Sequence, residues 1–297
     1  MDAIRTENLS KHYGNVVALD RLNLVVECGE LFGFLGPNGA GKSTTIRLLL
    51  DLIRPTAGRA TVLGIDCQRD PVGVRANVGY LPGDLRLYEH LTGEEMIDFF
   101  AALRRRPVDP AYVRELAGVL DLNLSRRAGT LSKGNRQKLG IVLALMARPP
   151  VLLLDEPTSG LDPLMQHAVW ELLRKEAARG TTVFFSSHVM SEVEQVCERV
   201  AILRQGRLVA VESVAGLKGR ALRHVEVTFA DELPPPGSVT HGNVRELRRA
   251  GRTIEFEVAG EFQPLLDLLK GYHVTDLRTE QPTLDEILLA FYSEAKR

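Results

Sequence analysis

The stretch that decides the fold reads Gly36-Pro37-Asn38-Gly39-Ala40-Gly41-Lys42-Ser43-Thr44. Positions 36 to 43 match the pattern G-x-x-x-x-G-K-[ST] and stand between the predicted strand Leu31–Leu35 and the helical pattern Thr44–Leu52. The three glycines allow the loop to curl until several backbone N–H groups point at one anion, and the following helix adds its positive end. We therefore predict a loop that holds nucleotide phosphates, in which Lys42 bridges the β- and γ-phosphates and Ser43 binds Mg²⁺.

A second stretch, Val151-Leu152-Leu153-Leu154-Asp155-Glu156, is typical of a buried strand that ends in two acidic residues. An unpaired carboxylate is costly to bury, so acids at the tip of such a strand usually face a cation or a water-filled site. Asp155 is placed to hold Mg²⁺, commonly through water. Glu156 is placed to orient and deprotonate the water that attacks the γ-phosphate. The alternative for this pair is an N-cap beside a solvated neighbour.

From about residue 3 to residue 211, short apolar runs alternate with helical patterns, which is typical of a mostly parallel sheet flanked by helices. Uniformly apolar runs predict strands that are buried on both faces, namely Leu31–Leu35, Val151–Leu154, Thr182–Ser186 and Val200–Leu203. Asp162 before Pro163 predicts a helix that ends near Gly180, and the spacing Ser191-x-x-Glu194 predicts another. The fold class is therefore α/β.

Two regions depart from this alternation. Between about residues 84 and 147 the strand signal vanishes, and amphipathic helices are predicted over Glu94–Arg105 and Tyr112–Leu120. After about residue 218 the predicted elements are the strands His224–Ala230 and Thr253–Val258 and short helices near Phe262–Lys270 and Thr283–Tyr292. We predict an α/β domain over residues 1–217 with a helical insertion at about 84–147, followed by a small α+β domain over 218–297.

Composition limits the partners. The chain has 297 residues, with 37 Lys+Arg against 38 Asp+Glu and a formal net charge of -1. A surface that binds duplex nucleic acid normally shows as a basic excess, so no nucleic acid is expected as the main ligand. The longest apolar stretches, such as Ile141–Ala147, fall short of the ~20 residues that cross a bilayer. If the protein acts at a membrane, a partner must provide the span.

With these motifs in this order, the chain resembles the nucleotide-binding subunit of ATP-binding cassette (ABC) transporters over about residues 3–215. Tyr13, in Lys-His-Tyr-Gly, matches the aromatic residue that stacks on adenine, and its alternative is an edge-strand tyrosine. Leu131-Ser132-Lys133-Gly134-Asn135 matches the signature loop, which reads Leu-Ser-Gly-Gly-Gln in the family. Ser159-Gly160-Leu161-Asp162 matches the D-loop, and His188 after the Thr182 strand matches the switch histidine, with a structural histidine as the alternative.

The resemblance implies a P-loop NTPase fold of the ABC type and an ATPase that uses ATP and Mg²⁺, with Lys42, Glu156 and His188 as catalytic residues. It implies a homodimer, or a pair with a similar ATPase subunit. Ser132 would cap the helix Gly134–Met146, and the signature residues, with Asn135, would reach the γ-phosphate held by the partner chain. It also implies an integral membrane permease as partner, so the chain is expected in the cytoplasm, peripheral on the inner face of the cell membrane.

The sequence departs from the family at two places. Gly83, in Tyr80-Leu81-Pro82-Gly83-Asp84, stands where the family usually has a glutamine, and glycine has no side chain to bind Mg²⁺ or water. Asp84 is a candidate substitute one position later. In the signature, Lys133 and Asn135 replace Gly and Gln, but the serine and the second glycine remain. We expect hydrolysis to be retained at a reduced rate.

Three functions compete. The tail that ends in Gln281-Pro282-Thr283-Leu284-Asp285-Glu286-Ile287 resembles the C-terminal domain of exporter-type ATPases that serve drug, antibiotic or polysaccharide efflux, and we expect it to stabilise the dimer. An importer subunit is the nearer alternative. A soluble ABC-type ATPase that acts on the ribosome or DNA is the other, although such proteins carry two cassettes or long coiled coils, and the chain has neither. The transported substrate is decided in the permease.

Overall fold

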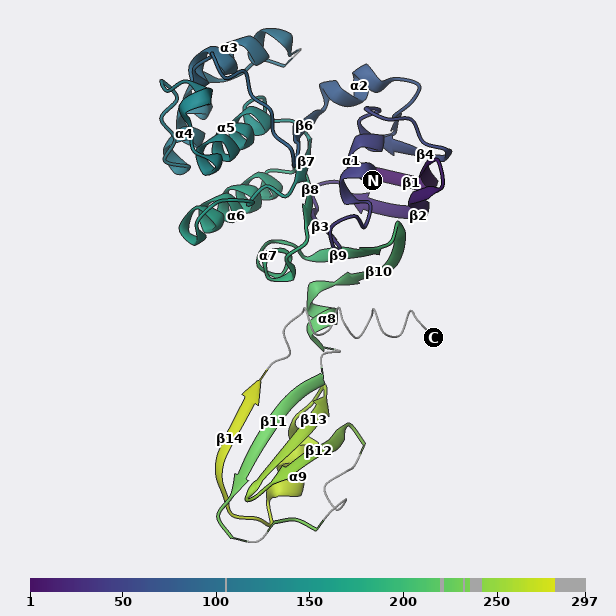
Figure 1. Ribbon diagram of the computed structural model, residues 1–297, viewed down its shortest axis with the longest axis vertical. Coiled ribbons are helices and arrows are strands. Elements are labelled where there is room, and N and C mark those ends of the chain that lie inside the picture. Colours follow the sequence, from purple (N-terminus) through teal and green to yellow (C-terminus); the bar gives the residue numbers. More distant parts are fainter. Residues whose placement is uncertain (105, 220–221, 232, 236–241, 281–297) are drawn as a thin grey trace. The chain divides into compact units, whose positions relative to one another are not determined.

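The computed structural model describes residues 1–104, 106–219, 222–231, 233–235 and 242–280. The chain forms two compact units, Met1–Val211 and Glu212–Arg297, each with its own sheet and core (Figure 1). The sequence placed the boundary at 217/218, slightly later. Among the described helices, none combines the length and the apolar character needed to cross a bilayer.

The larger unit is built on a six-stranded sheet in the order β10-β9-β3-β8-β7-β6. Its strands are β3 (Leu31–Leu35), β6 (Val78–Leu81), β7 (Val151–Asp155), β8 (Thr182–Ser187), β9 (Arg199–Arg204) and β10 (Arg207–Ser213). The pairs β3–β8, β3–β9, β6–β7 and β7–β8 are all parallel. Every residue of β3, β7 and β8 is buried, because helices cover one face and α1 with the second sheet described below covers the other. The four strands predicted from apolar runs are confirmed.

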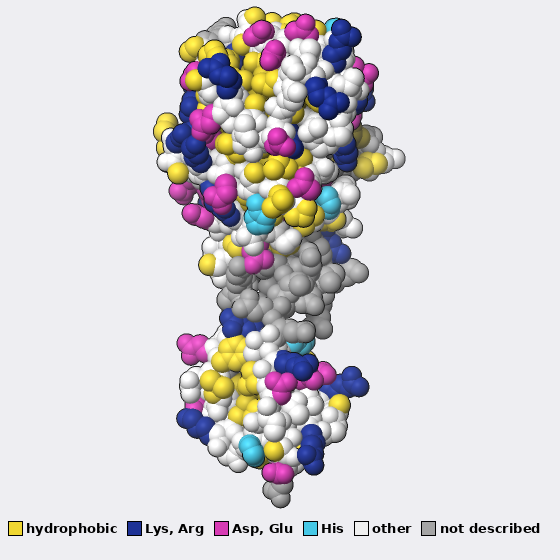
Figure 2. Space-filling view, turned by 90° about the vertical axis from the view of Figure 1, so that its left-hand side faces the viewer, with side chains coloured by type: hydrophobic (Ala, Val, Ile, Leu, Met, Phe, Trp, Pro, Cys, Tyr) yellow, Lys and Arg dark blue, Asp and Glu magenta, His cyan; other side chains and the backbone are white. Residues whose placement is uncertain are grey.

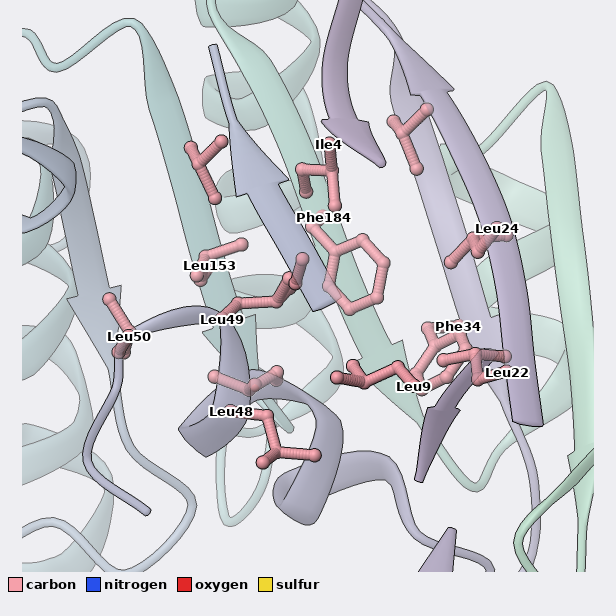
Figure 3. Packing of buried hydrophobic residues seen from close by; sticks show 14 of the residues in the cluster. Ile4, Leu9, Leu22, Leu24, Phe34, Leu48, Leu49, Leu50, Leu153 and Phe184 are labelled. Carbon is pink, nitrogen blue, oxygen red and sulfur yellow. The ribbon is translucent and has the colours of Figure 1, made fainter. Parts of the chain in front are cut away.

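An antiparallel sheet that the sequence did not predict lies beside it, in the order β2-β1-β4-β5. Its strands are β1 (Asp2–Tyr13), β2 (Val16–Glu27), β4 (Ala57–Val62) and β5 (Ile65–Asp66). Helix α1 (Lys42–Leu49) contributes Leu48 and Leu49 to the core that joins the two sheets, where Leu9 and Leu24 of the antiparallel sheet are packed with Phe184 of β8 (Figure 3). Because this helix is buried, the loop before it is held on a rigid base.

The predicted insertion is helical, because the described residues between 84 and 147 form helices and no β-strand. Its helices are α3 (Gly93–Leu103), α4 (Pro110–Val119), the 3-10 turn η1 (Ala128–Thr130) and α5 (Lys133–Leu145). The other described helices of the larger unit are α2 (Pro71–Ala76), α6 (Pro163–Ala178) and α7 (Met190–Val196). Asp162 caps α6 as predicted, with its carboxylate accepting from the Met165 N–H. The capping box at Ser191 is wrong, because α7 begins before Ser191 and its N-cap, Val189, has no side-chain acceptor.

The smaller unit is an antiparallel sheet in the order β12-β13-β11-β14 with one helix packed against it. Its elements are α8 (Val214–Gly219), β11 (Leu222–Phe229), β12 (Val244–Ala250), β13 (Thr253–Ala259), α9 (Gln263–Leu269) and β14 (Val274–Glu280). The predicted strands correspond to β11 and β13 and the first predicted helix to α9, whereas β12 and β14 were missed. The helix predicted near Thr283–Tyr292 lies outside the described residues.

Candidate functional site

The predicted phosphate-loop residues, the acid pair and His188 follow the carboxyl ends of the parallel strands β3, β7 and β8, and Gly83 follows the neighbouring β6. The register pairs Leu35 of β3 with Ser187 of β8, and Asp155 of β7 with Ser186 of β8. Leu81 of β6 pairs with Leu154 of β7. The loops that follow these strands therefore meet at one edge of the sheet, which is where open α/β sheets bind their ligands.

The phosphate-binding loop has the backbone that its glycines permit. Gly39 and Gly41 have φ values of 78° and 109°, a region that favours glycine. Gly36 is required for another reason, because a Cβ there would lie 2.3 Å from the carbonyl oxygen of Leu203. Pro37, Asn38 and Gly39 are exposed, whereas Ala40 is buried. The exposed crest therefore presents its backbone at the surface while both ends of the loop are fixed by packing.

Lys42 begins α1, with Ser43 and Thr44 half-buried in its first turn. The Lys42 side chain is only 5% exposed, and Nζ donates to the carbonyl oxygens of Gly36 at 2.6 Å and Pro37 at 3.2 Å. Burial lowers the pKa of Lys42, while the nearby carboxylates of Glu156 and Asp155 oppose this shift. The first turn of α1 contains no acid, so the loop, the helix end and the ammonium group together favour an anion.

Asp155 ends β7 and is 3% exposed. Its Oδ1 accepts a hydrogen bond from the Ser186 hydroxyl at 2.6 Å, which orients the carboxylate. Gly83 lies against the other oxygen, since a Cβ at position 83 would stand 3.1 Å from Asp155 Oδ2. Asp84 does not take the place of the absent glutamine here, because its carboxylate is exposed and is paired with Arg86 at 3.2 Å.

Glu156 has a left-handed backbone with φ of 51°, which turns the chain sharply after the strand. Its N–H donates to the Ser186 carbonyl oxygen at 3.1 Å, which holds this conformation in place. The Oε1 atom of Glu156 lies 2.8 Å from Nδ1 of His188 and 3.9 Å from Nζ of Lys42. The structure thus brings together the acid, the histidine and the lysine that the sequence predicted, although 32 residues separate the first two.

The signature segment lies at the start of α5. Ser132 is exposed and caps this helix, with its hydroxyl accepting from the Asn135 N–H at 3.3 Å. Gly134 is close to the D-loop, since a Cβ there would stand 3.1 Å from the Gly160 carbonyl oxygen. One turn further, buried Gln137 donates to the carbonyl oxygens of Glu156 at 3.1 Å and Pro157 at 3.0 Å. Sequence reasoning missed Gln137; its signal is a polar residue at the start of a buried apolar run.

Tyr13 stands apart from the residues described so far. It is the last residue of β1, its ring is exposed, and Nζ of Lys11 lies 5.0 Å from the ring centroid. An exposed aromatic face of this kind is available for stacking on a planar ring.

Comparison with known proteins finds relatives in one family. Residues 19–159 match the ABC transporter family model. The daunorubicin resistance ATP-binding protein DrrA2 of Streptomyces coeruleorubidus is 35% identical, covering 97% of this chain and 94% of its own length. An uncharacterized ABC transporter ATP-binding protein of Nostoc is 42% identical over 69% of this chain and 62% of its own length.

Among solved structures, an ATP-binding subunit of an ABC transporter aligns with a TM-score of 0.67 and 32% identity, covering 73% of this chain and 92% of its own. The dimeric bacterial cassette MJ0796 aligns with a TM-score of 0.65 and 26% identity, covering 71% of this chain and 98% of its own. A post-hydrolysis dimer of the same cassette with bound ADP and phosphate aligns at 25% identity with a TM-score of 0.64, over 71% of this chain and 98% of its own. The chain therefore belongs to the ABC transporter family, as one of its ATP-hydrolysing ATP-binding subunits.

Proposed function

We propose that this ATPase drives export through a separate integral membrane permease, as a homodimer or paired with a similar ATPase subunit, at the inner face of the cell membrane. The observation that carries the proposal is the match in length and domain content to the daunorubicin resistance ATP-binding proteins, which extends through the C-terminal unit. A drug-like compound is accordingly the substrate class. The alternatives are an importer subunit and an ATPase that acts on the ribosome or DNA. The copurification and transport experiment below distinguishes export from both.

Asp155 and Ser43 would hold Mg²⁺ in this scheme. The donor set fits, because a carboxylate and a hydroxyl are hard oxygen ligands and the buried Asp155 carboxylate has hydrogen-bond support from Ser186. The cation supplies charge neutralisation on the β- and γ-phosphates. Lys42 would exchange its contacts with the loop carbonyls for phosphate oxygens, and the exposed ring of Tyr13 would stack on adenine.

Glu156 would orient the attacking water and take its proton, and His188 would hold the γ-phosphate and fix the Glu156 carboxylate through their 2.8 Å contact. Ser132 is exposed at the N-terminus of α5, whose first turn contains no acidic residue. This position supports a role for Ser132 in binding the γ-phosphate of the nucleotide held by a second copy of the chain. Gly134 in the same turn would add its backbone N–H group. Asn135 would add its side-chain amide, because its backbone N–H already donates to the Ser132 hydroxyl. Hydrolysis would then remove the γ-phosphate that joins the two subunits, releasing the dimer.

The permease would dock at the helical insertion. A groove of about 480 Å³ lies between α2 and α3 and is lined by Val72, Arg75, Ala76, Phe100, Leu103, Arg104 and Arg106. Next to it Tyr88, Phe99 and Phe100 form an aromatic cluster with ring centroids 5.3 to 6.4 Å apart. An apolar groove with basic edges suits the face of a short amphipathic helix. On the face of the molecule shown in Figure 2, acidic and basic side chains are interspersed and do not gather into one large patch of either charge.

Copurification tests the proposal. The chain is coexpressed with candidate polytopic membrane proteins, taken from the reading frames that neighbour its gene, and isolated through a tag on the chain. We expect a stoichiometric complex that Leu103→Asp abolishes, because Leu103 is 66% exposed and lines the groove, so the charge blocks docking without unfolding the chain. Val119→Asp, on exposed Val119 of the same insertion, serves as control. Recovery of ribosomes or DNA instead would refute the proposal. ATP-driven movement of substrate toward the ATPase side of the membrane in reconstituted vesicles would refute export.

The C-terminal unit would stabilise the dimer. It has its own buried core on β11, β13 and α9, which includes Val225, Phe256 and Leu265, so its removal leaves the core of the larger unit intact. We expect a chain cut after residue 219 to hydrolyse ATP but to dimerise more weakly with ATP in sedimentation measurements. Equal dimerisation by the full and the shortened chain would contradict this role.

A further inference from the structure

Glu192 joins two loops of the site. It lies in the first turn of α7, and each of its carboxylate oxygens accepts a hydrogen bond from a different hydroxyl group. Thr158 Oγ1 donates to Oε1 at 2.7 Å, and Ser187 Oγ donates to Oε2 at 2.6 Å. These short distances are typical of hydroxyl donors to a charged carboxylate, which is the stronger class of hydrogen bond.

The two donors belong to the two segments that carry the reacting groups. Thr158 is two residues after Glu156 and leads into the D-loop, and Ser187 directly precedes His188. Both donors are only 1% exposed, so no bulk water competes for their hydroxyl groups. Ser187 Oγ also accepts from the Val189 N–H at 2.9 Å, which fixes the turn on the other side of His188.

We propose that Glu192 is a positioning residue, which sets the distance between Glu156 and His188 by holding their two segments to one carboxylate. The proposal rests on the roles proposed above for those two residues. A carboxylate suits the task because it only accepts hydrogen bonds and has two oxygens, so it satisfies both hydroxyl groups at once. An amide in the same geometry would keep its oxygen for one hydroxyl group and turn its NH₂ group, which cannot accept, toward the other.

The simpler explanation is that Glu192 only stabilises α7, since an acid in the first turn of a helix is favoured by the helix dipole. The two explanations differ in what they require of Thr158. Helix stabilisation needs no hydroxyl group on the D-loop side, whereas positioning needs it. The test therefore compares the two partners of the same carboxylate.

The experiment measures ATP affinity and single-turnover hydrolysis with the full chain. We expect Glu192→Ala to lower the hydrolysis rate about tenfold or more, because small misplacement of reacting groups has effects of this size, and to leave ATP affinity unchanged. Glu198→Ala is the matched control, since Glu198 is an exposed acid just beyond the end of α7. A loss of ATP affinity with an unchanged hydrolysis rate would overturn the proposal.

Thr158 supplies the decisive comparison. Thr158→Val keeps the shape and removes the hydroxyl group, so we expect it to lower the rate as Glu192→Ala does. Thr158→Ser keeps the hydroxyl group and should retain the parent rate. The double variant Thr158→Val with Glu192→Ala should be only slightly slower than either single variant, because both break the same link. Equal rates for the valine and serine variants would overturn the proposal.

Glu156→Gln separates this proposal from the one on which it rests. If that variant stops hydrolysis while Glu192→Ala hydrolyses ATP at the parent rate, the link is wrong and the role of Glu156 stands. If Glu156→Gln hydrolyses ATP at the parent rate, the role of Glu156 is wrong and the positioning role fails with it.

Discussion

Replacing Glu156 by glutamine tests the chemistry of the site most directly. The side chain is 27% exposed, and its Oε1 lies 2.8 Å from Nδ1 of His188 and 3.9 Å from Nζ of Lys42. Glutamine has nearly the same shape and keeps one oxygen for these contacts. What it lacks is the negative charge and the ability to take a proton from water.

The size of the effect follows from the loss of the general base. A positioned general base contributes about 10²- to 10⁴-fold to a rate, which corresponds to about 3–5 kcal/mol in the activation free energy. Binding should survive, because the loop amides and Lys42, which would face the phosphates, are unchanged. Lys42 also loses a carboxylate that would compete with phosphate for its ammonium group. We therefore expect slow hydrolysis together with an ATP-bound dimer that accumulates.

Single-turnover hydrolysis of labelled ATP measures the first effect, and size-exclusion chromatography with ATP measures the second. Glu198→Gln, which changes an exposed acid outside the site, controls for the loss of one charge. Hydrolysis by the Glu156 variant within about tenfold of the parent rate would refute its assignment as general base, because that falls below the range expected for such a group.

The remaining predictions concern the phosphate loop, a glycine of the helical insertion and the cysteines. Lys42→Ala should weaken ATP binding by about 1.5–3 kcal/mol, or about 10- to 100-fold, in a nucleotide titration, because a charged donor to phosphate is lost. Burial lowers the Lys42 pKa from its ordinary value of 10.5, so on raising the pH its ammonium group loses the proton earlier than that of an exposed lysine. ATP affinity of the parent, measured by the same titration, should therefore begin to decline before the pH reaches 10.5. Gly36→Ala should reduce the free energy of unfolding by about 1–3 kcal/mol in denaturant, because its Cβ would lie 2.3 Å from a backbone oxygen. Gly118→Ala, in α4 with open space around it, should instead stabilise by up to about 1 kcal/mol. Burial raises the pKa of Cys67 to about 12, so at pH 8 mass spectrometry should find alkylation at exposed Cys28 and none at Cys67 until the chain is unfolded.

The sequence by itself determined the features that depend on neighbouring residues. The phosphate-binding loop was predicted because glycine spacing and a lysine at a helix start are local properties, and α1 begins at Lys42 as that motif requires. The caps at Ser132 and Asp162 were predicted for the same reason, since a cap bonds to an N–H three residues away.

Only the tertiary structure decided the relations between distant segments. The antiparallel sheet of β1, β2, β4 and β5 was missed because its strands alternate in burial imperfectly and pair across bulges, which weakens the period that identifies a strand. The contact of Glu156 with His188 and the link through Glu192 follow from β7 and β8 lying side by side. Strand order is set by burial of a shared core rather than by local propensity, so no spacing along the chain could specify these contacts.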